Sequence, residues 1–114
     1  MGRKLLLTLW LLLMIAVVAG SLLPESASPM AALDRLGAPD FVLHSVAYTV
    51  LAFLPAVLIR PRRRGQYAAA AMFVLGLALE IAQLAAPGRE FELVDLAANA
   101  VGVVVGIVGA RLVD

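Results

Sequence analysis

Residues 93–113 read LVDLAANAVGVVVGIVGARLV, an apolar stretch that only Asp95, Asn99 and Arg111 interrupt. An α-helix needs about 20 predominantly apolar residues to cross the ~30 Å hydrocarbon core of a bilayer, so this stretch can span one. Lipid offers the backbone no hydrogen-bond partners, and a helix supplies its own. We therefore predict a transmembrane helix here, and the polar residues within it require a separate explanation.

The rest of the chain has the same character. It has 114 residues, of which 63% are hydrophobic, and its mean hydropathy is +1.00. Soluble domains are about 45–50% apolar. Prolines 24, 39, 61 and 87 separate the apolar runs, as expected for loops. The sequence predicts an all-α fold, a four-helix transmembrane bundle with short loops that forms one domain over residues 1–114. The expected helices cover about residues 5–23, 41–59, 67–86 and 93–113.

The first run allows a second interpretation. Arg3 and Lys4 precede it, and the small residues Ala27 and Ser28 follow it, as in a secretory signal peptide. However, the run exceeds the roughly 7–15 apolar residues of a signal core, and Pro29 is unfavourable for cleavage nearby. We expect this run to be retained as the first transmembrane helix.

The basic residues indicate an orientation. If the spans alternate, most of the nine Lys and Arg residues lie on one side of the membrane. An excess of Lys and Arg marks the cytoplasmic side, so we expect both termini in the cytoplasm of a bacterium and the chain in its inner membrane. The short loop after the second span could also bind anionic lipid head groups. The residues on the basic side are Arg3, Lys4, Arg60, Arg62, Arg63, Arg64 and Arg111, against Arg35 and Arg89 on the other.

Polar side chains form stripes on three of the expected helices, because residues three or four apart share a helix face. At a rise of 1.5 Å per residue, His44 lies about 5 Å and Tyr48 about 10 Å below the outer end of their helix. Glu80 and Asn99 also lie about 10 Å deep on theirs. We expect the stripes to converge on one polar pocket beneath the outer surface. Its candidate residues are Asp40, His44, Tyr48, Glu80, Gln83, Arg89, Asp95 and Asn99.

Structural roles compete with this hypothesis. Tyr48, Gln83 and Asn99 could simply hydrogen-bond between helices and fix their register. Asp40 follows Pro39 and could only cap the second helix. Carboxylates are costly inside a membrane, which favours a functional role for Glu80 and Asp95.

Small residues form a ridge along the last expected helix. A small residue every fourth position lets a second helix approach closely, so we expect this ridge to pack helices, although it could also form a dimer face. The ridge consists of Ala98, Gly102, Gly106 and Ala110.

The order and spacing of these residues resemble the VanZ-like membrane protein family, named for a protein associated with teicoplanin resistance. The resemblance covers about residues 21–106 and is most specific from Glu80 to Gly106. Phe41 stands where the family often has Lys. The resemblance implies a role in the cell envelope and a link to glycopeptide tolerance. The matching positions are Asp40, His44, Tyr48, Glu80, Gln83, Arg89, Asp95, Asn99 and Gly102.

Several functions remain open. We favour binding of an envelope lipid, a lipid-linked envelope component or a glycopeptide, because an Arg side chain can pair with phosphate or carboxylate. A small intramembrane enzyme could use His44 with the carboxylates as acid and base, and one histidine with carboxylates could hold a divalent cation. Ion transport is less favoured, since the inner segments 51–58, 68–79 and 103–110 carry no ionisable group.

Composition limits these functions further. The absence of cysteine excludes disulfides and thiolate chemistry. We expect membrane lipid as a partner, a homo-oligomer as an option, no nucleic acid, no cofactor and no dedicated metal site. The remaining alternative is a structural membrane protein whose polar residues only lock the packing of its helices.

Overall fold

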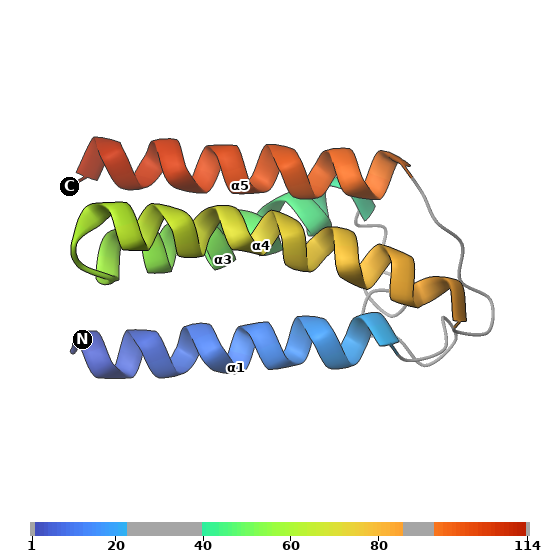
Figure 1. The fold of residues 1–114 in the computed structure, drawn as a ribbon, viewed down its shortest axis with the longest axis horizontal. Coiled ribbons are helices and arrows are strands. Elements are labelled where there is room, and N and C mark those ends of the chain that lie inside the picture. Colours follow the sequence, from blue (N-terminus) through green and yellow to red (C-terminus); the bar gives the residue numbers. More distant parts are fainter. Residues whose placement is uncertain (1, 23–39, 86–92, 114) are drawn as a thin grey trace.

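The computed structural model describes residues 2–22, 40–85 and 93–113. These residues form four α-helices, α1 (Arg3–Leu22), α3 (Asp40–Leu58), α4 (Arg62–Ala82) and α5 (Leu93–Val113), and a 3-10 turn η2 (Gln83–Ala85) follows α4. Each helix is long and apolar enough to cross a membrane. The helices run up and down in turn, so the N-terminal end of α1 and the C-terminal end of α5 lie at one end of the bundle (Figure 1).

The connection between α3 and α4 is shorter than the apolar runs predicted. Helix α4 begins at Arg62 rather than near Tyr67, because the arginines continue the helix beyond its apolar part. Pro61 starts it in an extended conformation and accepts hydrogen bonds from the backbone N–H groups of Arg64 and Gly65. A Cβ on Gly65 would lie 2.6 Å from the Pro55 carbonyl oxygen, so this tight reversal requires a glycine there.

Helix α3 is the centre of the bundle. It packs most extensively on α5, then on α4 and then on α1 (Figure 1). Its buried side chains Leu51, Ala52 and Ala56 meet Ala69 of α4 and Val103 of α5. Small side chains dominate this core, which allows the helix backbones to approach closely.

The contact between α3 and α5 is the most extensive between the described helices, and two glycines allow their backbones to approach closely. A Cβ on Gly102 would lie 2.5 Å from the Ser45 carbonyl oxygen, and one on Gly106 would lie 2.6 Å from the Thr49 carbonyl oxygen. Both distances are too short for a real side chain. We call this contact of Gly102 and Gly106 with α3 the glycine seam. The whole ridge Ala98, Gly102, Gly106 and Ala110 is buried in the folded chain.

Helix α1 has no buried residue and is attached in a different way. Pro55 inside α3 has no N–H, so the Leu51 carbonyl four residues earlier loses its usual helical donor. The Trp10 indole of α1 donates to this carbonyl at 2.8 Å. The side chain therefore satisfies a backbone group that would otherwise be costly to leave unpaired in lipid.

Two further hydrogen bonds hold the ends of α1. The Arg3 guanidinium donates from Nε to the Leu58 carbonyl in the last turn of α3, at 2.8 Å. At the other end, Gln83 Nε2 donates to the Ser21 carbonyl in the last turn of α1, at 3.1 Å. Carbonyls in the last turn of a helix lack intrahelical donors, so both side chains satisfy acceptors that the helix leaves unpaired.

Candidate functional site

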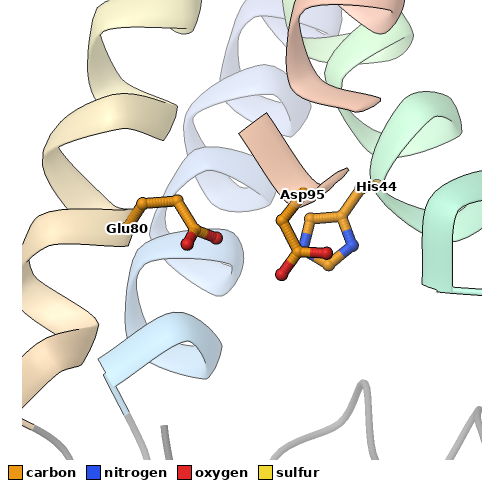
Figure 2. Close-up of side chains that lie close together, drawn as sticks. All are labelled: His44, Glu80 and Asp95. Carbon is orange, nitrogen blue, oxygen red and sulfur yellow. The ribbon is translucent and has the colours of Figure 1, made fainter. Parts of the chain in front are cut away.

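Three helices each direct one ionisable side chain toward the same point. These are His44 of α3, Glu80 of α4 and Asp95 of α5, and we call them the acid–imidazole cluster (Figure 2). One ligand atom from each residue lies within 4.8 Å of the corresponding atoms of the other two. His44 Nε2 and Asp95 Oδ2 are 3.9 Å apart. That separation is too long for a direct hydrogen bond.

The positions of these residues in their helices explain the convergence. His44 lies one turn after the start of α3, Asp95 lies in the first turn of α5, and Glu80 lies in the last turn of α4. Because α4 runs opposite to α3 and α5, its end meets their beginnings (Figure 1). All three residues therefore lie within about 8 Å of the same end of the bundle.

A second layer of polar groups lies one helical turn deeper. Tyr48 follows His44 by four residues, Asn99 follows Asp95 by four, and Gly76 precedes Glu80 by four. A Cβ on Gly76 would lie 2.6 Å from Asn99 Nδ2 and 3.1 Å from the Tyr48 hydroxyl, so these two side chains meet at the glycine. We call Tyr48, Gly76 and Asn99 the lower layer.

Burial differs between the members of the site. Glu80 is 3% exposed and Asn99 is 2% exposed, whereas the side chains of His44 and Asp95 are each 17% exposed. Glu80 is therefore the buried member of the cluster, and His44 and Asp95 are its more exposed members. Among the described residues, the Asn99 side-chain oxygen is buried without a hydrogen-bond partner. A buried acceptor without a donor is costly and points to a missing partner.

The other predicted pocket residues have different positions. Gln83 is buried, and its amide nitrogen bonds to α1 rather than to the cluster. Asp40 begins α3 as expected, but its side chain and the whole of Arg89 lie outside the described residues. The structure thus brings together His44, Tyr48, Glu80, Asp95 and Asn99 from the predicted set.

Several contributing residues were missed by the sequence analysis. Gly76 makes room for the lower layer, and its spacing of four from Glu80 was the available signal. Ser45 Oγ donates to the Ala98 carbonyl at 3.3 Å and ties α3 to α5 beside the site. The Pro55–Trp10 relation was also missed, although a proline inside a span indicates an unsatisfied carbonyl.

The three side chains of the cluster are of types that could hold a metal ion. Two carboxylates and one imidazole offer oxygen and nitrogen acceptors on three sides of one point. The nearby hydroxyls of Ser45 and Thr49 both donate to backbone carbonyls, at 3.3 and 2.7 Å. Neither has the hydrogen bond to a base that an activated nucleophile requires.

Comparison with known proteins bears on this geometry. A family model described as VanZ/LLP1 matches residues 5–114, which is nearly the whole chain. The chain belongs to the VanZ/LLP1 family. The predicted resemblance is thereby confirmed, and all four helices of this VanZ/LLP1 protein lie almost wholly inside the match.

Searches of curated proteins and of solved structures returned no match to this VanZ/LLP1 chain. Its membrane character is supported by the family and by four helices that are suited to span a bilayer.

Proposed function

We propose that this VanZ/LLP1 protein binds the polar head group of an envelope lipid, or of a lipid-linked or glycopeptide-type ligand, at the acid–imidazole cluster. The observation that carries the proposal is the convergence of His44, Glu80 and Asp95 from three separate helices. Packing alone does not require it, because the glycine seam and the small-residue core already join these helices. Ionisable groups at such depth generally serve a function.

The charge distribution supports an extracytoplasmic location for the cluster. Arg3, Arg62 and Arg111 belong to the end of the bundle that carries both termini, opposite to the cluster (Figure 1). Under the positive-inside rule that end faces the cytoplasm, so the cluster faces the outer leaflet of the inner membrane. A ligand would then approach from the outer leaflet past His44 and Asp95.

Orientation can be tested directly because the chain has no cysteine. Gly2→Cys and Leu93→Cys place single thiols at exposed positions at opposite ends. A membrane-impermeant maleimide should label Leu93→Cys in intact cells. It should label Gly2→Cys only after the cells are lysed. The reverse pattern would place the cluster on the cytoplasmic side and contradict the proposed orientation.

The binding proposal is tested by mass spectrometry of lipids that co-purify with the full chain. Wild-type protein should carry a defined lipid that is depleted in Glu80→Gln and Asp95→Asn. Val94→Ala is the matched control, because Val94 is exposed beside Asp95 and has no part in the cluster. If the cluster variants retain the same lipid at wild-type ratio, the cluster is not the binding site.

One observation favours a second candidate, a small intramembrane enzyme. His44 Nε2 faces Asp95 Oδ2 at 3.9 Å, and a carboxylate beside an imidazole is the usual arrangement for orienting a general base. Such an enzyme would act through water, since the neighbouring hydroxyls are engaged with carbonyls. A chemically altered lipid that appears with wild type and not with His44→Gln would favour catalysis over binding.

Glycopeptide tolerance follows as a further part of the proposal. Expression in a susceptible host should raise the inhibitory concentration of teicoplanin, and Asp95→Asn should abolish the increase at equal protein level. An equal increase with Asp95→Asn would show that tolerance does not depend on the cluster.

A homo-oligomer remains a proposal. The ridge from Ala98 to Ala110 is already buried within one chain, so a dimer would have to use another face.

A further inference from the structure

The separations within the acid–imidazole cluster are close to those of ligands around one metal ion. Zinc binds nitrogen and oxygen ligands at about 2.0–2.2 Å, so two ligands on a tetrahedral ion are about 3.4 Å apart. His44 Nε2 and Asp95 Oδ2 are 3.9 Å apart, and all three ligand atoms lie within 4.8 Å of each other. Small side-chain rotations would bring them to coordination distance.

The ligand types are also consistent with a metal. Imidazole suits zinc and other first-row transition metals, and carboxylates suit both these and harder cations such as Mn²⁺. Three protein ligands leave at least one coordination position open for water or another group. In addition, a divalent ion would neutralise the two negative charges that Glu80 and Asp95 otherwise bring into the bundle.

The lower layer supplies an independent indication of a ligand. Asn99 is 2% exposed, and its side-chain oxygen has no hydrogen-bond donor among the described residues. Its amide lies one turn below Asp95 on the same face of α5, directly beneath the cluster. A water molecule bound to the ion could donate to this oxygen and complete the second shell that metal sites usually have.

From these observations we propose that His44, Glu80 and Asp95 bind one divalent transition-metal cation. The open coordination position of the ion holds a phosphate oxygen or another anionic oxygen of the head group. This second half of the proposal rests on the proposed function. The negative charges of two carboxylates repel an anionic head group, whereas a shared cation bridges it to them. This replaces our sequence-based expectation of no dedicated metal site.

The ion itself is tested on the full chain in lipid nanodiscs, after chelation and dialysis. Zn²⁺ and Mn²⁺ are titrated separately, and bound metal is counted by elemental analysis. The proposal predicts one ion per chain for at least one of the two metals. Wild-type protein that binds neither overturns the metal site, and this result does not depend on whether any variant folds.

Variants then assign the ligands. His44→Gln, Glu80→Gln and Asp95→Asn should each weaken binding about 100-fold or more, because loss of outer-shell partners alone costs 10–100-fold. Val94→Ala is the matched control and should keep one ion, since Val94 is exposed beside Asp95 and has no part in the cluster. If folded cluster variants bind as tightly as Val94→Ala, the ion is held elsewhere and the assignment fails.

Lipid measured on the same samples separates the two proposals. Loss of the co-purified lipid on chelation and its return with the ion support the metal bridge. Lipid that persists after chelation overturns the proposal that the ion holds the head group. The lipid site and the ion are then two independent features of the protein. If the protein carries the lipid but binds no ion, the metal site is overturned and the proposed function stands. If it binds the ion but carries no lipid, the metal site stands and the proposed function is overturned.

Discussion

The two interfaces of α3 are built by opposite means. In its contact with α5, the glycine seam, the two helix backbones pack directly against each other. There is no room for even a methyl group at Gly102 or Gly106. Its contact with α1 leaves every residue of α1 at least partly exposed. It combines partly buried apolar side chains of α1 with side chains that donate to backbone carbonyls. In lipid, apolar burial gives little drive for helix association, so close packing and hydrogen bonds are the two available means.

This difference has a consequence for function. Every described residue of the acid–imidazole cluster and of the lower layer lies on α3, α4 or α5. These helices share the tight core, whose geometry tolerates little change. Helix α1 contributes only attachment in the described residues. We therefore expect substitutions in the seam to disturb the site and substitutions in the α1 contacts to leave it intact.

The largest effect is expected in the seam itself. Gly106→Ala places a methyl group 2.6 Å from the Thr49 carbonyl oxygen, and such overpacking costs about 1–3 kcal/mol of unfolding free energy. Gly109→Ala is the matched control, since its Cβ would meet only Phe53 at 3.6 Å. That variant should be neutral or more stable by up to about 1 kcal/mol, because alanine favours helices.

Unfolding of both alanine variants in mixed micelles by titration with sodium dodecyl sulfate measures the difference. Equal stabilities for Gly106→Ala and Gly109→Ala would mean that the seam is not the tight contact described here. Metal or lipid binding should fall only in Gly106→Ala.

A smaller effect is expected for the hydrogen bond between α1 and α3. Trp10→Phe removes the donor to the Leu51 carbonyl. It should cost between about 0.6 kcal/mol, the average for hydrogen bonds between membrane helices, and about 1.7 kcal/mol, the largest value found for them. Pro55→Ala restores a backbone N–H that can serve the same carbonyl. In that background Trp10→Phe should therefore cost less.

The four proteins of this double-mutant cycle can be compared by the same titration. An equal cost of Trp10→Phe with and without Pro55 would show that the indole acts through packing and not by replacing the missing N–H.

The smallest effect is expected at the outer end of α1. Gln83→Leu removes the bond to the Ser21 carbonyl and should cost about 0.6 kcal/mol. Bound metal and lipid should stay at wild-type level, while hydrogen exchange near the end of α1 should increase. A loss of bound metal or lipid in this variant would show that Gln83 contributes to the pocket, as its sequence position predicted.

Much of this arrangement could be predicted from residues alone. Hydropathy indicated four spanning helices, and polar stripes on three of them predicted one shared pocket. The structure brings His44, Glu80 and Asp95 of that predicted set together. The start of α4 differed from the prediction because hydropathy detects the lipid-facing segment and not the basic turn at Arg62. Helix periodicity likewise placed Glu80 and Gln83 on one face, but it could not show that the Gln83 amide bonds to the Ser21 carbonyl of α1, since that contact depends on how two helices pack.

Other features required three dimensions. The spacing of Gly76 from Glu80 places it on the site face of α4, but no spacing within one helix shows that it meets Asn99 or that Trp10 reaches Leu51. Both relations depend on how separate helices pack. The small-residue ridge was visible in the sequence, but its two possible uses, within the chain or between chains, were not distinguishable there.

The most direct test of the central claim is pulsed electron paramagnetic resonance of Mn²⁺ bound to the full chain. If three helices jointly hold one ion, the spectrum should show nitrogen modulation from a single imidazole, and His44 is the only histidine in the chain. This modulation should disappear in His44→Gln and persist in Val94→Ala, whose exposed side chain has no part in the cluster. Bound Mn²⁺ without nitrogen coupling, or no specifically bound Mn²⁺ or Zn²⁺ at all, would contradict the account.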